Sequence, residues 1–310
     1  MKDLITKTGE YHLPSADYHA DPCKTPSLSA SLADTILSGT PRHAWLESPR
    51  LNPDHEPVEK RAFDIGSAAH EVLLGNGKGV WVIDAENYRT KAAQEARDDA
   101  RAMGHTPLLR SEADKVETMI RALEDQLPSY DIGNPFKDNP TERTLIWEAD
   151  GCVNRCMVDC IDHEKRVAYD YKTASGYADP EVWVRRSMDH GVDLRAAHYL
   201  DGLKAVHGGE WKYRFVIQEK EAPHLISVVE LTAEAVGMGA KKLDRARNVW
   251  RWCLERNVWP GWPTQIAVVE APIFFETKWL EREEREANYR QHHGKDILEM
   301  AYAWQAPAAE

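Results

Sequence analysis

The sequence predicts a mixed α/β fold, with one central β-sheet flanked by helices, a helical part before it and a helical tail after it. Three observations lead to this prediction. Helical patterns dominate the chain up to residue 127, three strand-like segments follow one another between 141 and 174, and helices then alternate with further strands. The chain has 310 residues, 42% hydrophobic and 29% charged, which is ordinary for a globular protein with a sizeable core.

The first part of the chain, residues 25–130, is expected to be mainly helical after a polar, irregular stretch at 1–25. Residues 27–39 have serines that can cap a helix, then apolar residues at helical spacing, and the prolines of "TPRHAWLESP" end this helix. A loop at 51–60 precedes a second helix at 61–74, which "GNG" ends. Its apolar stripe comprises Phe63, Ile65, Ala69, Val72 and Leu73.

The segment before the sheet combines one strand with a long helical region. Residues 79–84 ("GVWVID") have the composition of a short strand. Residues 86–127 follow a helical pattern that is interrupted near "MGHTP" at 103–107. The second helical piece starts with Ser111 and Asp114, which resemble a capping box.

Strand patterns at 141–150, 151–162 and 166–174 predict a β-meander, because turn signals lie at Asp150-Gly151 and His163-Glu164. Further elements follow in order. We expect helices at 179–191 and 193–208, two strands within 211–231 around the turn "EAPH", a helix at 232–257, a Pro-rich turn and a possible strand at 258–272, and helix at 277–305.

This order predicts a single domain over residues 1–275, with the meander and core at 140–275, and a helical tail at 276–310. No run of about 18 apolar residues occurs, and the N-terminus lacks an apolar signal core, so we expect a cytoplasmic protein without a membrane span. Five cysteines without an export signal argue against a disulfide framework. The net charge of −12 argues against a broad basic surface, so any DNA contact needs a local patch.

The strand "RVAYDYKTASG" places Asp170 and Lys172 two residues apart, hence on one face. Asp159, on the preceding strand, lies at hairpin distance from Asp170. Two close carboxylates favour a bound cation, and oxygen ligands favour Mg²⁺ or Mn²⁺. Lys172 could hold a water or stabilise charge on a phosphate. The alternative is a surface Asp–Lys ion pair that contributes little.

Two further candidates come from helices. His70 shares one face with Gly66 and Phe63, so it points inward, either as a nitrogen ligand to the same metal or as a core histidine. Arg195 and Tyr199 are four residues apart on one face of the helix at 193–208. Simple surface or core placement is the alternative for this pair.

Together these residues resemble the PDDEXK nuclease superfamily, with its restriction-endonuclease-like core, and in particular the RecE-like (exonuclease VIII-type) nucleases of phages and prophages. The resemblance covers roughly residues 25–275. The "WPGW" turn and the early Ser-rich helix ending in "TPRHAW" also resemble that branch. Its motifs appear as "GSAAH" (66–70), the acid of "MVDCID", "DYK" (170–172) and "RAAHY" (195–199).

By this resemblance His70, Asp159, Asp170 and the Tyr171 carbonyl would hold the metal. Lys172 would orient the attacking water, and Tyr199 would support the site or contact DNA. The family usually has Gln where Arg195 stands. Because a guanidinium accepts no hydrogen bond, Arg195 is expected to contact a phosphate instead.

The implied activity is Mg²⁺-dependent hydrolysis of phosphodiester bonds, for which Mn²⁺ can substitute. The resemblance further implies double-stranded DNA ends as substrate, 5′-to-3′ resection that leaves 3′ single-stranded overhangs, a ring-shaped homo-oligomer, and phage-type recombination with a single-strand annealing protein in a bacterial host cell. Two alternatives stay open: a PDDEXK endonuclease or helicase-associated nuclease, and a non-catalytic DNA-binding or assembly protein.

Basic residues outside the motifs are candidates for DNA contact. Arg185 and Arg186 lie in "WVRR", and "KKLDRARNVWR" contains Lys241, Lys242 and Arg245, among other cations. These residues could grip phosphates or form a solvated helix face. The last candidates are cysteines. Some PDDEXK relatives hold an iron–sulfur cluster, but Cys152, Cys156 and Cys160 recur every four residues along a strand, and we expect small buried hydrophobes facing away from Asp159.

Overall fold

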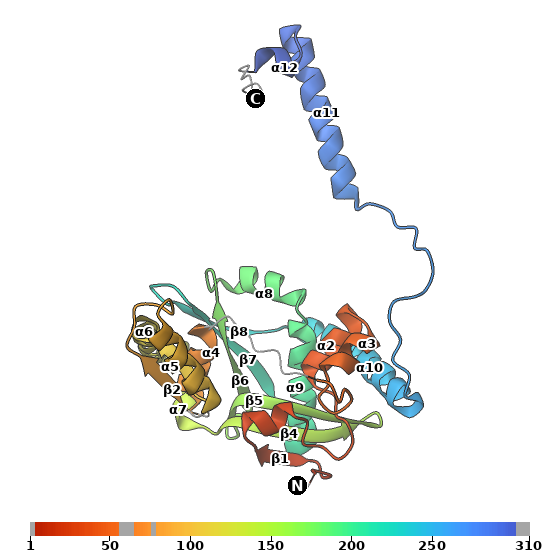
Figure 1. The fold of residues 1–310 in the computed structure, drawn as a ribbon. Helices are drawn as coiled ribbons and strands as arrows, with labels where there is room; N and C mark the ends of the chain where they lie inside the picture. Colours follow the sequence, from red (N-terminus) through yellow and green to blue (C-terminus); the bar gives the residue numbers. More distant parts are fainter. Residues whose placement is uncertain (1–3, 56–64, 76–78, 302–310) are drawn as a thin grey trace. The chain divides into compact units, whose positions relative to one another are not determined.

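Six strands form one mixed sheet in the order β1-β4-β5-β6-β7-β8 (Figure 1). The computed structural model describes residues 4–55, 65–75 and 79–301. The sheet is mixed, because only the β6–β7 pair is parallel and the other four pairs are antiparallel. A mixed central sheet with flanking helices confirms the predicted α/β class. The strands are β1 (Gly9–His12), β4 (Thr141–Ala149), β5 (Cys152–Asp162), β6 (Val167–Ala174), β7 (Lys212–Glu219) and β8 (Ile226–Glu230).

The N-terminal stretch is more ordered than its polar sequence indicates. The prediction of an irregular segment at 1–25 is wrong, because β1 pairs with the edge of β4 and α1 (Ser15–His19) follows it. The predicted first helix is α2 (Ala30–Ser38), where the Ser29 side chain accepts a hydrogen bond from the Leu32 amide. The prolines do not simply end it: Pro41 occupies the first turn of a separate helix, α3 (Pro41–Glu47).

The predicted helix at 61–74 is seen as α4 (Ile65–Leu74), while Phe63 lies outside the described residues. Strand β2 (Val80–Ile83) is also as predicted, but it pairs in parallel with β3 (Thr106–Leu109), in the segment expected only to interrupt a helix.

Helices α5 (Lys91–Ala102) and α6 (Arg110–Gln126) flank β3. The capping residues of α6 differ from the prediction, because Glu112 rather than Asp114 accepts a hydrogen bond, from the Leu109 amide at 2.8 Å. Two short helices, η1 (Leu127–Tyr130) and α7 (Pro135–Asp138), lead from α6 to the main sheet.

The predicted meander is confirmed as β4, β5 and β6. Its second hairpin turns at residues 163–166, between the paired residues Asp162 and Val167. Two helices, α8 (Pro180–Met188) and α9 (Val192–His207), then connect β6 to its parallel neighbour β7. A parallel pair requires such a crossover connection, because a tight turn reverses the direction of the chain and therefore joins antiparallel strands.

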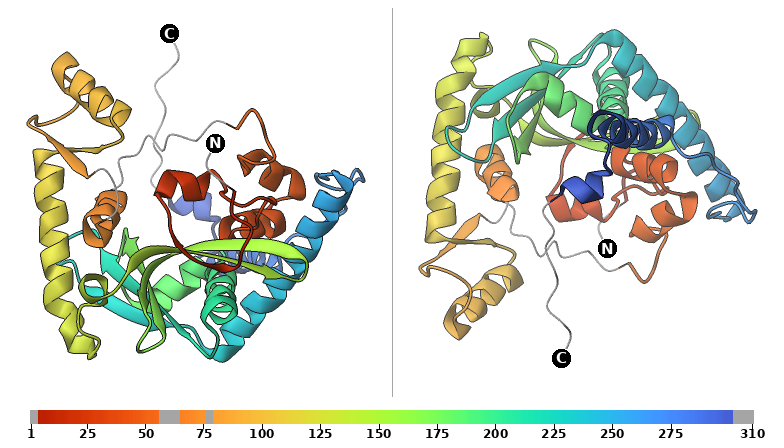
Figure 2. Two further views of the ribbon diagram at one scale, coloured as in Figure 1. Left: turned by 90° about the horizontal axis from the view of Figure 1, so that it is seen from below. Right: turned by 90° about the horizontal axis from the view of Figure 1, so that it is seen from above.

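The sheet is covered on both faces. One face buries Tyr169, Tyr171 and Val216 against α4 and α6. The other face buries Leu145, Phe215 and Ile217 against α8 and α9, in a second core. In both views of Figure 2 the yellow helix α6 and the blue-green helix α10 border the sheet at opposite ends. The residues of the meander between these two cores are therefore held from both sides.

Helix α10 (Ala233–Arg256) packs closely on α9 and matches the predicted helix at 232–257. The contact depends on Gly239, where an added Cβ would lie 2.1 Å from the Asp193 carbonyl oxygen. Helices α2 and α10 share a third core with Leu194 of α9. Through these contacts the N-terminal helices are joined to the element that carries Arg195 and Tyr199.

The end of the chain forms a separate unit, Pro263–Glu310, after a first unit of Met1–Trp262. The possible strand at 258–272 is wrong, because these residues are exposed and irregular apart from a partly buried Trp259 against Trp250. The predicted tail helix is seen as α11 (Ile273–His293) and α12 (Ile297–Met300); residues 302–305 of that prediction lie outside the described part. Among the described residues, no helix combines the length and apolar character needed to cross a membrane.

The close approach of α10 to α9 can be tested with two glycines of the same helix. Gly239→Ala is expected to lower the free energy of unfolding by about 1–3 kcal/mol, because the added methyl overlaps the Asp193 backbone. Gly237→Ala is the matched control: its Cβ meets nothing within 4 Å, and alanine favours helix by up to about 1 kcal/mol. Urea unfolding measures both, and equal effects of the two changes would contradict the packing described.

Candidate metal-dependent active site

The two strands that carry the predicted acidic residues separate where those residues lie. The β5–β6 ladder extends from the pair Asp162–Val167 to the pair Cys160–Tyr169, one residue short of Asp159 and Asp170. Beyond this point β5 stays paired with β4, and β6 stays paired with β7. The divergence leaves room for side chains between the strands, and both carboxyl groups occupy it.

Asp159 is held by one backbone donor and one imidazole. Its Oδ2 accepts a 2.8 Å hydrogen bond from the Tyr171 amide, which is on the opposite strand. The same oxygen lies 3.2 Å from Nε2 of His70 on α4. The His70 side chain is 32% exposed and that of Asp159 12%, so the pair borders a solvent-accessible space. The structure thus brings His70 and Asp159 together, as their predicted shared role requires.

Asp170 faces the same space from β6. Its Oδ1 forms an ion pair with Nζ of Lys172, the next residue on that face of the strand. Lys172 Nζ also donates a hydrogen bond to the Tyr171 carbonyl oxygen, at 3.3 Å. Among the described residues, Asp170 Oδ2 is buried without a hydrogen-bond donor. A buried carboxylate oxygen without a donor is costly, and a cation would satisfy it.

The two carboxyl groups have different acidities because their neighbours differ. Burial by itself raises the pKa of Asp159, but the charges of His70 and Lys172 outweigh it and hold that pKa below the usual value. Burial raises the pKa of Asp170; Lys172 opposes this rise and the Asp159 charge adds to it. Burial lowers the pKa of His70, yet the adjacent Asp159 reverses the direction, so the net shift is upward. Asp159 is therefore the carboxylate that stays ionised.

Arg195 and Tyr199 face the same space from α9. With His70, Asp159, Asp170 and Lys172 they line one cleft of about 740 Å³, whose remaining wall comes largely from the N-terminal segment. Burial lowers the pKa of Arg195, but the phenol of Tyr199 and the Asp170 carboxylate reverse this, and the guanidinium stays charged. Burial raises the pKa of Tyr199 well above its usual value, so its phenol stays neutral. The cleft thus combines the ionised Asp159 carboxylate with the guanidinium of Arg195.

These residues fit a divalent cation. Two carboxylates and one imidazole of the cleft offer oxygen and nitrogen ligands, and the Asp170 oxygen without a donor is a place where a cation would fit. The Tyr171 carbonyl, the fourth predicted ligand, accepts a hydrogen bond from Lys172 Nζ. In the part of the chain that the structure describes, His70, Asp159 and Asp170 do not form a cluster whose donor atoms all lie within 4.8 Å of one another. His70 contacts Asp159 directly, whereas Lys172 occupies the space beside Asp170.

Arg155 is a cleft residue that the sequence interpretation missed. It lies on β5 four residues before Asp159, and a charged residue inside an apolar strand was the available signal. Its side chain is 5% exposed, donates to the Ser27 carbonyl oxygen at 2.7 Å and lies 3.3 Å from Asp21. Arg155 therefore fixes the N-terminal segment against the cleft.

The cysteines of β5 are all buried thiols, but they do not all share one side of the sheet. Cys156 packs in the α9 core, whereas Cys160 packs with Tyr169 and Tyr171 in the α4 core, on the side of His70. The expectation that all three face away from Asp159 is wrong for Cys160. The physical reason is that strand alternation is broken between Asp159 and Cys160, where β5 leaves β6.

The other basic candidates lie outside the cleft. Arg185 and Arg186 are exposed on α8. Lys241, Lys242 and Arg245 line a separate hollow of about 480 Å³ between α10 and α2. There Lys242 is partly neutralised by Asp193, at 2.7 Å. Of the predicted DNA-contacting residues, Arg195 is the one that the structure places beside the acidic pair.

Comparison with known proteins places this geometry in a family. Residues 37–272 match the family described as "PDDEXK-like domain of unknown function (DUF3799)". A crystal structure from Eubacterium rectale, described as a "Putative exonuclease", superposes with a TM-score of 0.55 at 14% identity, over 86% of this chain and 98% of that one.

A second solved structure, that of SSO0001, gives a TM-score of 0.31 at 14% identity, over 78% of this chain and 89% of that one. This value is too low to support an argument. A comparison with curated protein sequences gave no match.

The His70–Asp159 contact can be tested by titration of the metal-free protein. In wild type the pKa of His70 is raised, and Asp159→Asn is expected to move its midpoint below about 6.5, because burial and Lys172 then act without the opposing charge. NMR of the imidazole protons measures this, with His70→Gln to assign the signal and Asp162→Asn as control.

The sign for stability follows from the same shift. Because the folded-state pKa of His70 is raised, its stabilising effect is fully present below the unfolded value of about 6.5 and is lost as pH rises through the folded value. An unchanged His70 midpoint in Asp159→Asn would disprove the pairing.

Proposed function

This chain belongs to the family of PDDEXK-like domains DUF3799, and on that premise we propose that it is a divalent-metal-dependent nuclease that hydrolyses phosphodiester bonds of DNA. The observation that carries the proposal is the group of residues where β5 and β6 diverge. Asp159, Asp170 and Lys172 gather there with His70 in one cleft, in the order along the chain that this fold uses for phosphodiester hydrolysis.

His70, Asp159, Asp170 and the Tyr171 carbonyl would hold the metal, for which Mg²⁺ is the proposed ion and Mn²⁺ a substitute. When bound, such an ion polarises the scissile phosphate and lowers the pKa of a coordinated water. Asp159 contributes a carboxylate that is ionised across the neutral range, since its pKa is lowered. Asp170 contributes the buried oxygen that lacks a donor.

Lys172 has two roles in this proposal. Without metal it neutralises Asp170, and with metal its ammonium is released to orient the attacking water and to stabilise negative charge that develops on the phosphate. Lys172 can do both because its side chain is 32% exposed, at the border of the cleft.

Arg195 and Tyr199 would act on the phosphate from the opposite wall. A guanidinium donates two parallel hydrogen bonds that match the oxygens of a phosphate. Arg195 therefore binds the phosphate, at the position where the family usually has a glutamine. The neutral phenol of Tyr199 can donate one hydrogen bond. Beyond the cleft, we assign Arg185, Arg186, Lys241, Lys242 and Arg245 to non-specific phosphate contacts.

The finer part of the proposal concerns the substrate and its context. We propose double-stranded DNA ends as substrate, 5′-to-3′ resection that leaves 3′ overhangs, a ring-shaped homo-oligomer, and a single-strand annealing protein as partner in RecE-like recombination within the bacterial cytoplasm. A chain with a net charge of −12 supports a substrate held locally rather than over a broad surface, because its exterior repels DNA elsewhere.

Loss of one carboxylate tests the site directly. Asp170→Asn is expected to reduce hydrolysis of linear duplex DNA in Mg²⁺ or Mn²⁺ by at least about 10²–10³-fold, since it removes a charge that the metal and the developing transition state both need. Asp162→Asn is the matched control, because Asp162 lies on β5 beyond the cleft and an amide oxygen can still accept from the Lys165 amide. Wild-type rates in Asp170→Asn, or no cleavage by wild type with either metal, would overturn the proposal.

The requirement for an end can be tested with three DNA molecules of one sequence. A 5′-labelled linear duplex should be degraded, a covalently closed circle should be spared, and a linear duplex with blocked 5′ ends should be protected. Gel analysis of the products measures all three. Cleavage of the closed circle at a similar rate would replace the exonuclease by an endonuclease on the same core.

A further inference from the structure

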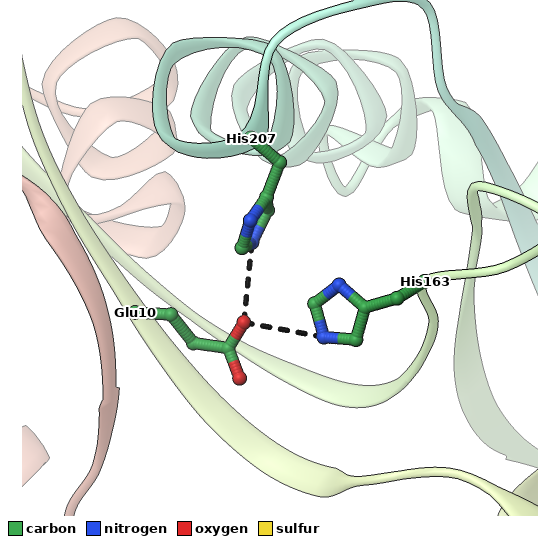
Figure 3. Close-up of side chains that lie close together, drawn as sticks. All are labelled: Glu10, His163 and His207. Carbon is green, nitrogen blue, oxygen red and sulfur yellow. Dashed lines mark ion pairs between the residues drawn. The ribbon is translucent and has the colours of Figure 1, made fainter.

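A second group of potential metal ligands lies away from the cleft, at the opposite end of the β5–β6 hairpin. Glu10 comes from β1, His163 from the turn between β5 and β6, and His207 from the last residue of α9 (Figure 3). One donor atom from each side chain lies within 4.8 Å of the other two. Three elements that are far apart in sequence thus direct ligand-type side chains at one point.

The distances match those between neighbouring ligands of one metal ion. Glu10 Oε2 lies 3.3 Å from His163 Nε2 and 3.2 Å from His207 Nε2. Donor atoms at about 2.0–2.1 Å from a tetrahedral Zn²⁺ are about 3.3 Å apart. Both histidines approach the same carboxylate oxygen, as ligands around a shared cation do (Figure 3).

Hydrogen bonding does not account for this approach. His207 Nε2 is buried, and within the described residues it has no hydrogen-bond partner despite its 3.2 Å distance from Glu10. The two imidazole rings lie 4.9 Å apart edge to face, so they would repel each other if both were protonated. A cation bound between the three donor atoms would account for their close approach.

The surroundings orient the ligands. Arg143 lies 3.6 Å from the other carboxylate oxygen of Glu10, which leaves Oε2 to the histidines. Trp211 packs against both rings, with centroid distances of 6.0 Å to His163 and 5.5 Å to His207, and its indole donates to the Gly208 carbonyl oxygen. These contacts restrict the orientations of the carboxylate and of the two rings.

We propose that Glu10, His163 and His207 form a zinc site, distinct from the catalytic cleft, with a water molecule as the fourth ligand. Two imidazoles and one carboxylate suit Zn²⁺ rather than Mg²⁺, which prefers oxygen ligands and retains its water. The site fastens the short strand β1 and the end of α9 to the hairpin that carries Asp159 and Asp170. The proposal does not depend on nuclease activity.

The test uses the full chain with the cleft disabled. In an Asp159→Asn/Asp170→Asn background, titration calorimetry and the absorption spectrum of Co²⁺ are expected to show one tight site per chain that excess Mg²⁺ does not displace. His163→Ala in that background should weaken Zn²⁺ binding by more than the roughly 10–100-fold that loss of a supporting contact causes. His163 is 41% exposed on a turn, so its loss leaves the fold intact.

Two further variants make the outcome decisive. His207→Gln should remove the same Co²⁺ spectrum, and His190→Ala, an exposed histidine between α8 and α9, should retain it. Zn²⁺ should raise the melting temperature of the background protein and of the His190→Ala control, but not of His163→Ala. Equal Zn²⁺ affinity with and without His163, or no tight site in a folded background protein, would overturn the proposal.

Discussion

The divergence of β5 and β6 after the Cys160–Tyr169 pair is the constraint on which the site depends. Each strand keeps a partner on its other side, so the separation costs little of the sheet. It frees the Tyr171 amide for the Asp159 side chain and creates the space in which two carboxyl groups meet. A continuous ladder would fill that space with backbone hydrogen bonds and would leave no room for the two carboxyl groups between the strands.

The features that the sequence could predict are those set by local rules. Side-chain alternation alone put Asp170 and Lys172 on one face, and they form an ion pair. A cap at Ser29, turn residues at 163–166 and helical spacing around Tyr199 similarly act over a few residues, and the corresponding elements are present. The order of the motifs then indicated the family, because four weak patterns in one sequence order are more specific than any one of them.

What could not be predicted depends on contacts between distant segments. Strand β1 is short and polar, and it is a strand only because β4 offers an edge. Strand β3 forms within an apparent helical region because β2 lies beside it. Cys160 lies on the unexpected side because alternation rules assume an unbroken ladder. The contact between His207 and Glu10 could not be predicted either. About two hundred residues separate them along the chain, and only the fold brings their side chains to 3.2 Å.

In the proposed metal site, the ion pair between Lys172 and Asp170 would make cation binding depend on charge. An ion that enters must compete with an ammonium group tethered to the same strand, so a monovalent cation such as K⁺ replaces one positive charge by another and gains little. A divalent cation would bring one more positive charge to the two carboxyl groups than a monovalent cation does. Discrimination by valence would therefore follow from Lys172 together with Asp159 and Asp170, before any preference among divalent ions arises from size or ligand type.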